Sequence, residues 1–251
     1  MQFPDLRVRL NTEYARLRLA AIDLEAPVPS CPEWSVDQLL RHVASVYLHK
    51  VAAMQTGLRP QNWVPEYSTE PALELLDRAY LELTAEFERR EPQAPTWTWF
   101  PSNQTVGFWI RRMAHETAIH RYDAELAAGL TTPVVNDLAA DGVDEALTVI
   151  LTDGGDVRAI TEVAHLLKSP DSPEIDLPTI EVRNGARAFF VRPTPKGVFV
   201  DETGQAATTI EGVPSDLLLW LWSRADADNL KVTGDPSGVA VLNQLMKTAT
   251  Q

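Results

Sequence analysis

Glu116 and His120 lie four residues apart in a stretch with helical periodicity, so two side chains that can bind a metal share one helix face. His120 falls within the apolar stripe of this helix, and Glu116 lies near its edge. The stripe consists of Val106, Trp109, Met113, Thr117, Ala124 and Ala127. Burying two ionisable side chains costs free energy unless they bind a metal ion or form hydrogen bonds. The pair is therefore either part of a metal site that lacks one ligand, or a structural hydrogen bond between a histidine and a glutamate with no ion.

The spacing of the histidines excludes a zinc protease helix. In that motif two histidines four residues apart bind the ion, and the glutamate after the first acts as a base. Here His115 and His120 are five residues apart, which separates them by roughly 140° around a helix that turns about 100° per residue. They cannot bind one ion together, whereas Glu116 and His120 can.

The third ligand is sought among the remaining histidines, and His42 is the best candidate. It lies at the edge of the apolar stripe of a predicted helix over 35–56, which begins at the capping box formed by Ser35 and Gln38. His49 is two turns further along, roughly 10 Å away, and could not share the ion without distortion. The other two histidines are assigned to ordinary packing: His115 and His165.

Two segments carry a family resemblance. Residues 31–42, Cys-Pro-Glu-Trp-Ser-Val-Asp-Gln-Leu-Leu-Arg-His, and residues 111–125 together resemble the mycothiol-dependent maleylpyruvate isomerase family. Residues 215–224 look like the C-terminal signature of that family, so the resemblance covers nearly the whole chain. It implies a DinB-like up-down helical bundle in which a metal is bound by His42, Glu116 and His120.

The resemblance implies a metal-dependent enzyme that activates a low-molecular-weight thiol, mycothiol, for S-transfer to a small electrophile or for thiol-assisted isomerisation. Two histidines and a glutamate suit zinc or another divalent ion and leave a coordination position open. The alternative is a non-catalytic protein that binds a metal or small ligand on the same scaffold. The residues leave open the electrophile, the native metal and the thiol.

Two further residues are candidates for catalytic roles. Asp123, three residues beyond His120, could orient an imidazole or a substrate group, or be an ordinary surface carboxylate. Arg224 matches an arginine of the family signature and could hold a carboxylate of the substrate or of the thiol cofactor, or complement a helix C-terminus. We expect three arginines near the motif to face solvent: Arg111, Arg112 and Arg121.

Composition favours a small-molecule partner. The net charge of −13 disfavours nucleic acids and anionic membranes. The N-terminus lacks the apolar run of a signal peptide, and no stretch approaches a membrane span, so we expect a cytoplasmic protein that is a monomer or weak dimer. The single cysteine, Cys31, excludes an internal disulfide and is expected to be a half-buried loop residue.

Periodicity predicts a helical N-terminal part and a smaller α+β C-terminal domain. The family resemblance implies that this second domain is similar to a sterol-carrier module. Helices are expected over 5–23, 35–56, 71–90, 105–129, 136–152, 156–168 and 215–224, with a last one through Leu242. Strands are expected over 179–182, 188–192, 197–200 and 207–211 and near 230–233, with a hairpin turn at Asn184-Gly185. The Pro-rich segment 169–173 is taken as the boundary between domains 1–168 and 174–251. The aromatic segment 92–101 either lines the site or anchors a loop.

Overall fold

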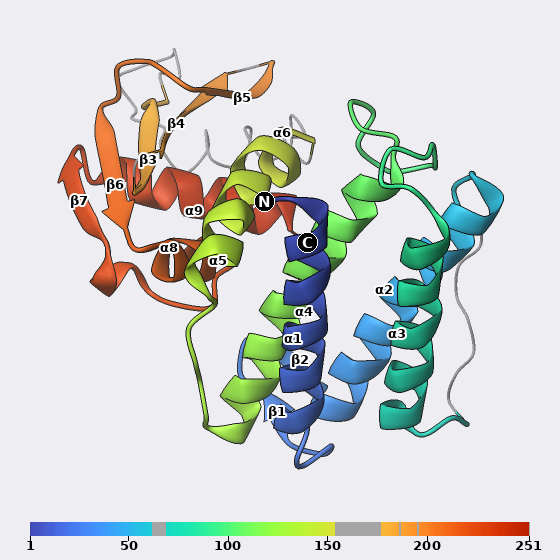
Figure 1. Ribbon diagram of the computed structural model, residues 1–251. Coiled ribbons are helices and arrows are strands. Elements are labelled where there is room, and N and C mark those ends of the chain that lie inside the picture. The colour runs from blue at the N-terminus through green and yellow to red at the C-terminus, as the bar shows by residue number, and fades with distance from the viewer. Residues whose placement is uncertain (62–68, 154–176, 186, 195, 251) are drawn as a thin grey trace. The chain divides into compact units, whose positions relative to one another are not determined.

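The computed structural model describes residues 1–61, 69–153, 177–185, 187–194 and 196–250. The chain divides into two compact units, Met1–Thr132 and Pro133–Gln251. The first is helical and the second is α+β, as the sequence predicts (Figure 1). No helix in the described part of the chain is long and apolar enough to cross a membrane.

Four long helices form the first unit, and each lies within a few residues of its predicted range. They are α1 (Phe3–Ala20), α2 (Val36–Thr56), α3 (Ala72–Arg89) and α4 (Val106–Ala128). Two short antiparallel strands, β1 (Pro27–Val28) and β2 (Cys31–Ser35), lie between α1 and α2. Figure 1 shows α2 and α3 running in the same direction, opposite to α1 and α4. The strict alternation of an up-down bundle is thus interrupted between α2 and α3.

Capping residues determine where the two helices that carry the candidate ligands begin and where α4 ends. Ser35 caps α2 in the predicted capping box, in which its hydroxyl accepts from the Gln38 backbone and the Gln38 side chain accepts from Ser35 N–H. The Thr105 hydroxyl caps α4 by accepting from the Phe108 backbone N–H, and Gly129 ends the helix in the left-handed conformation with φ 70°. Gly107 lets α4 approach α1, because a Cβ there would lie 2.6 Å from the ring of Phe3.

The expectation that the arginines of α4 face solvent is wrong for two of them. Arg112 is 4% exposed and Arg121 is fully buried. Arg121 enters the interior because two carboxylates meet it there: its Nε lies 2.6 Å from Glu13 of α1, and its Nη1 lies 2.8 Å from Glu125. Arg111 is half-buried.

The second unit is built on a five-stranded sheet in the order β5-β4-β3-β6-β7. The strands are β3 (Ile180–Asn184), β4 (Arg187–Thr194), β5 (Gly197–Asp201), β6 (Thr208–Gly212) and β7 (Lys231–Gly234). Only the β3–β6 pair is parallel, and β3 and β4 form the predicted hairpin at Asn184-Gly185. The helices are α5 (Asn136–Glu145), a π-helix (Ala146–Ile150), α6 (Leu151–Asp153), α8 (Pro214–Leu221), a 3₁₀ turn (Ala227–Asn229) and α9 (Ser237–Ala249), the last extending beyond Leu242.

The division between the units differs from the predicted boundary. The segment that begins with α5 belongs to the second unit because α5 packs on α8. Polar contacts reinforce this packing: the Asn184 side chain donates to the Ala140 carbonyl at 3.2 Å, and Arg187 pairs with Asp144 at 2.7 Å. The predicted helix over 156–168 and the connector over 169–173 lie outside the described residues.

Candidate metal centre

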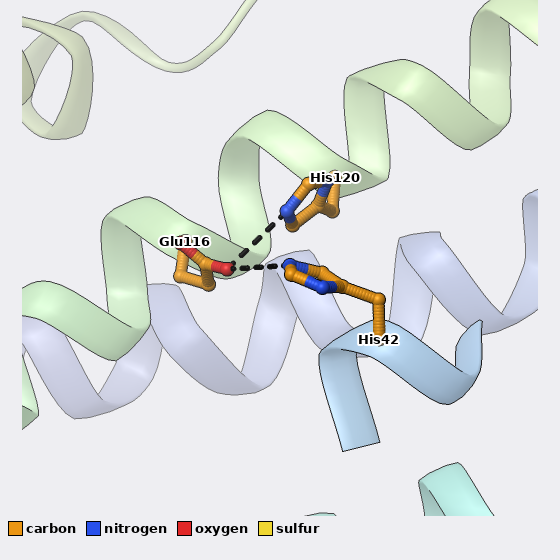
Figure 2. A group of neighbouring side chains, drawn as sticks. All are labelled: His42, Glu116 and His120. Atoms are coloured by element: carbon orange, nitrogen blue, oxygen red, sulfur yellow. Dashed lines mark ion pairs between the residues drawn. The ribbon is translucent and has the colours of Figure 1, made fainter. Parts of the chain in front are cut away.

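His42, Glu116 and His120 converge on one point (Figure 2). Glu116 Oε1 lies 3.2 Å from His120 Nε2 and 3.4 Å from His42 Nε2. Zinc bonds of about 2.0–2.1 Å in a tetrahedron place neighbouring ligand atoms roughly 3.3 Å apart. The ligand atoms of all three residues lie within 4.8 Å of one another, and no other such group occurs in the parts of the chain that the structure describes. The donor types and their spacing therefore fit a divalent metal ion.

The two helices supply these ligands from opposite sides. Glu116 and His120 are one turn apart on α4, and His42 faces them from α2. The His42 side chain is 36% exposed, whereas that of His120 is 9% exposed. The side of the site that belongs to α4 is thus buried. The side that belongs to α2 is exposed to solvent, and a small molecule could approach there.

Buried hydrogen bonds orient His120. Its Nδ1 lies 2.9 Å from Asp123 Oδ2, and Ser30 Oγ donates to Asp123 Oδ1 at 2.5 Å. Asp123 is fully buried. A carboxylate on Nδ1 keeps a proton there and leaves Nε2 available for a metal. Orienting the imidazole is one of the two roles predicted for Asp123, and the hydrogen bond to His120 Nδ1 is the contact that this role needs.

Two side chains that the sequence did not connect with the site also contact the triad. Arg112 donates from Nη2 to Glu116 Oε2 at 3.1 Å, which turns Oε1 toward the two imidazoles. Trp34 packs its ring 4.7 Å from the ring of His42 and 6.3 Å from that of His120. Trp34 belongs to the segment 31–42, but the sequence alone does not indicate that its ring packs near both histidines. That contact follows from the position of β2.

Comparison with family models agrees with this geometry. The model of the mycothiol maleylpyruvate isomerase N-terminal domain matches residues 7–125, and the model of the C-terminal domain of the same family matches residues 137–240. The chain belongs to the mycothiol maleylpyruvate isomerase family. The N-terminal match contains His42, Glu116 and His120. No curated protein and no solved structure matched the chain.

Electrostatics in this family member favour a charged pair when no metal is bound. Burial alone would raise the pKa of Glu116, but the neighbouring His120, His42 and Arg112 bring it well below its ordinary value. Burial would lower the pKa of His120, but Glu116 and Asp123 outweigh it and raise the pKa to about 9. This imidazolium stabilises the metal-free fold fully below its ordinary pKa, and the contribution is lost as the pH rises through about 9.

Metal binding is therefore expected to compete with a proton on His120. A metal needs the neutral imidazole, so binding at pH 7 must displace the proton. We expect zinc affinity to rise by about tenfold per pH unit between pH 7 and 9 and then to level off. Chelator competition titrations across this range would measure it, with a correction for zinc hydrolysis. An affinity independent of pH over these two units would contradict the assignment of His120 as a ligand.

The other candidates from the sequence are not members of the triad. The ring of His49 lies 6.0 Å from that of Trp97, and His115 is buried within α4. His165 lies outside the described residues. Cys31 is half-buried, as expected, although it lies in β2 rather than in a loop. Arg224 lies in the second unit, just after α8, where its Nη1 donates to the Trp222 carbonyl at 2.8 Å.

The aromatic segment anchors a loop. Trp109 Nε1 of α4 donates to the Trp97 carbonyl at 2.9 Å, and the two rings lie 6.1 Å apart. Trp99 packs edge-on against Phe108 at 5.0 Å. These contacts favour the second of the two interpretations of the segment, an anchor under a long connection between α3 and α4.

Proposed function

We propose that the protein binds a divalent metal ion, zinc by preference, at His42, Glu116 and His120 and uses it to activate mycothiol toward a small electrophile. The observation that carries this proposal is the convergence of two imidazole nitrogens on one carboxylate oxygen, which lies 3.2 Å and 3.4 Å from them, close to the separation of neighbouring ligand atoms around zinc. Three protein ligands leave a fourth position for a thiol. Membership of the mycothiol maleylpyruvate isomerase family supports mycothiol as that thiol.

The metal would supply one chemical effect, which is to lower the pKa of a bound thiol so that the thiolate is present near neutral pH. The protein's own residues hold the ligands in place for this. Arg112 fixes the Glu116 carboxylate through Oε2, and Asp123 fixes the His120 ring through Nδ1. We propose that Asp123, with Ser30 behind it, is a positioning residue.

Two outcomes follow from attack of the thiolate sulfur on an electrophilic carbon. If the new carbon–sulfur bond breaks again after rotation about the former double bond, the product is a geometric isomer and the thiol is returned. If the bond is retained, the carbanion formed at the neighbouring carbon takes up a proton, the product is a thioether and the reaction is S-transfer. The triad serves both outcomes, and the substrate decides between them.

Arg224 remains a proposed substrate-binding residue. It lines a polar cavity of about 330 Å³ in the second unit together with Asn243 and Lys247. Two cations and an amide line this cavity together with one carboxylate, Asp226, which leaves one positive charge in excess for an anionic group of the substrate.

Calorimetric titration of mycothiol into zinc-loaded protein tests the proposal. We expect saturable binding of mycothiol by the wild-type protein. In Glu116→Ala the affinity for mycothiol should fall by roughly 100-fold or more, because this variant removes the only anionic ligand and with it a large share of metal affinity. Glu33→Ala is the matched control, since Glu33 is exposed on β2. A wild-type protein that holds zinc but gives a flat titration would favour a non-catalytic metal-binding protein.

A further inference from the structure

The two histidines of the triad are held in different ways. The Nδ1 of His120 is fixed by Asp123, which Ser30 fixes in turn. His42 forms no such hydrogen bond at Nδ1 within the described residues, and its Nε2 faces Glu116 Oε1 at 3.4 Å. Its side chain is 36% exposed, so the helices enclose it only in part. A side chain that is free to change rotamer must be ordered when an ion binds, and this ordering costs affinity.

Aromatic rings surround the His42 imidazole instead. The centre of the Trp34 ring lies 4.7 Å from that of His42, with 39° between the ring planes. This separation is within the range of about 4.5–7 Å at which aromatic rings attract each other. The ring of His120 meets that of His42 edge-on, at 4.9 Å and 76°. Ring contacts rather than a hydrogen bond at Nδ1 therefore define how the His42 imidazole is turned.

The backbone around Trp34 is joined to the helix that carries His42. Trp34 lies in β2, and the next residue, Ser35, is the cap of α2. The first residue of that helix, Val36, donates its N–H to the Ala26 carbonyl at 3.0 Å, just before β1. The hairpin of β1 and β2 is thus tied to the start of α2, and the indole is placed from the same end of the helix as the imidazole that it contacts.

We propose that Trp34 is a positioning residue that holds the His42 imidazole in the orientation a metal ion needs. The inference rests on the metal site of the proposed function and adds to it a residue outside the ligand set. The indole restricts rotation of the imidazole and keeps Nε2 directed at Glu116 Oε1, so less side-chain entropy is lost when an ion binds. Asp123 performs the same task for His120 through a hydrogen bond.

Zinc affinity, measured by chelator competition, tests this inference in three variants of the full chain. Trp34→Leu keeps an apolar side chain and removes the aromatic ring, whereas Trp34→Phe keeps a ring. Trp99→Leu is the matched control. Trp99 is also half-buried, but its ring packs against Phe108, which lies eight residues before Glu116 on α4, or roughly 12 Å along the helix axis. Circular dichroism checks that each variant is folded.

We expect Trp34→Leu to weaken zinc binding by about tenfold, the lower end of the range for residues that orient metal ligands. Trp34→Phe should stay within about threefold of the wild-type affinity, because a ring still faces the imidazole. Trp99→Leu should stay within about twofold, because it touches neither histidine.

The same substitution in His42→Ala protein separates positioning from a general loss of structure. His42→Ala retains a weak zinc affinity through Glu116 and His120, which titration with a weak chelator can measure. If Trp34 acts through His42, adding Trp34→Leu should change this residual affinity by less than about twofold, because the residue that it positions is already absent. A substitution that merely disturbed the hairpin would weaken zinc binding in both backgrounds.

Three results would overturn the inference: an affinity of Trp34→Leu within about twofold of the wild type, an equal loss in Trp34→Phe and Trp34→Leu, or an equal loss with and without His42. The titrations also separate it from the proposed function. If the zinc affinities follow the expected order but zinc-loaded wild-type protein does not bind mycothiol, the proposed function fails and the role of Trp34 stands. If mycothiol binds and Trp34→Leu has no effect on zinc, the reverse holds. A wild-type protein that binds no zinc overturns both.

Discussion

His42→Ala is expected to reduce bound zinc from about one equivalent to less than about a tenth of an equivalent after metal loading and desalting. The variant removes one of three ligands, and a structural zinc site with four ligands is worth about 10–16 kcal/mol, so one ligand contributes several kcal/mol. His42 is also the only ligand that comes from α2. Without it, Glu116 and His120 form an ordinary pair on one helix. Elemental analysis of the loaded protein measures the effect.

His49→Ala is the matched control for this prediction. His49 lies on the same helix and is also half-buried, but its ring packs near Trp97 rather than in the triad. We expect this variant to keep a full equivalent of zinc. If His42→Ala binds as much zinc as the control, His42 is not the third ligand. If the wild-type protein binds less than a tenth of an equivalent even after loading, the three residues form a structural polar cluster without a metal.

Local patterns explain why the helices could be predicted from the sequence. The capping box at Ser35, the glycine at the end of α4 and the apolar spacing between them depend only on residues close in the chain. The same holds for Glu116 and His120, whose relation is set by one helical turn. His42 could be proposed as their partner because few histidines exist and because its segment resembles a known family.

Contacts between distant segments explain what the sequence did not predict. Arg121 follows a pattern that reads as surface charge, yet it is buried against Glu13 of α1, which no local rule places there. Arg112 pairs with Glu116 one turn away, but its burial depends on the packing of the other helices. The boundary after Thr132 was missed because α5 looks like any amphipathic helix, and only its packing on α8 assigns it to the second unit.

Arg121→Met is expected to destabilise the helical unit by about 3–5 kcal/mol. The substitution keeps most of the side-chain volume but takes from Glu13, which is 1% exposed, the guanidinium that lies 2.6 Å away and leaves it only the more distant Arg16 at 3.6 Å. Glu125 loses the same partner and keeps Arg16 at 3.0 Å. An uncompensated buried carboxylate costs far more than a lost surface pair, because water cannot solvate it. Urea unfolding followed by circular dichroism measures the difference.

Two further variants separate charge burial from packing. Arg89→Met removes an arginine whose side chain is 69% exposed and pairs with Glu86, so a loss below about 1 kcal/mol is expected. The double variant Glu13→Gln with Arg121→Met removes both sides of the buried pair and should recover much of the stability lost in Arg121→Met, because the uncompensated Glu13 carboxylate is gone. If the double variant is less stable than Arg121→Met, loss of packing and hydrogen bonds, rather than an unpaired carboxylate, is the main cost. Because α1 and α4 are joined through this network, its failure would also loosen the helix that carries Glu116 and His120.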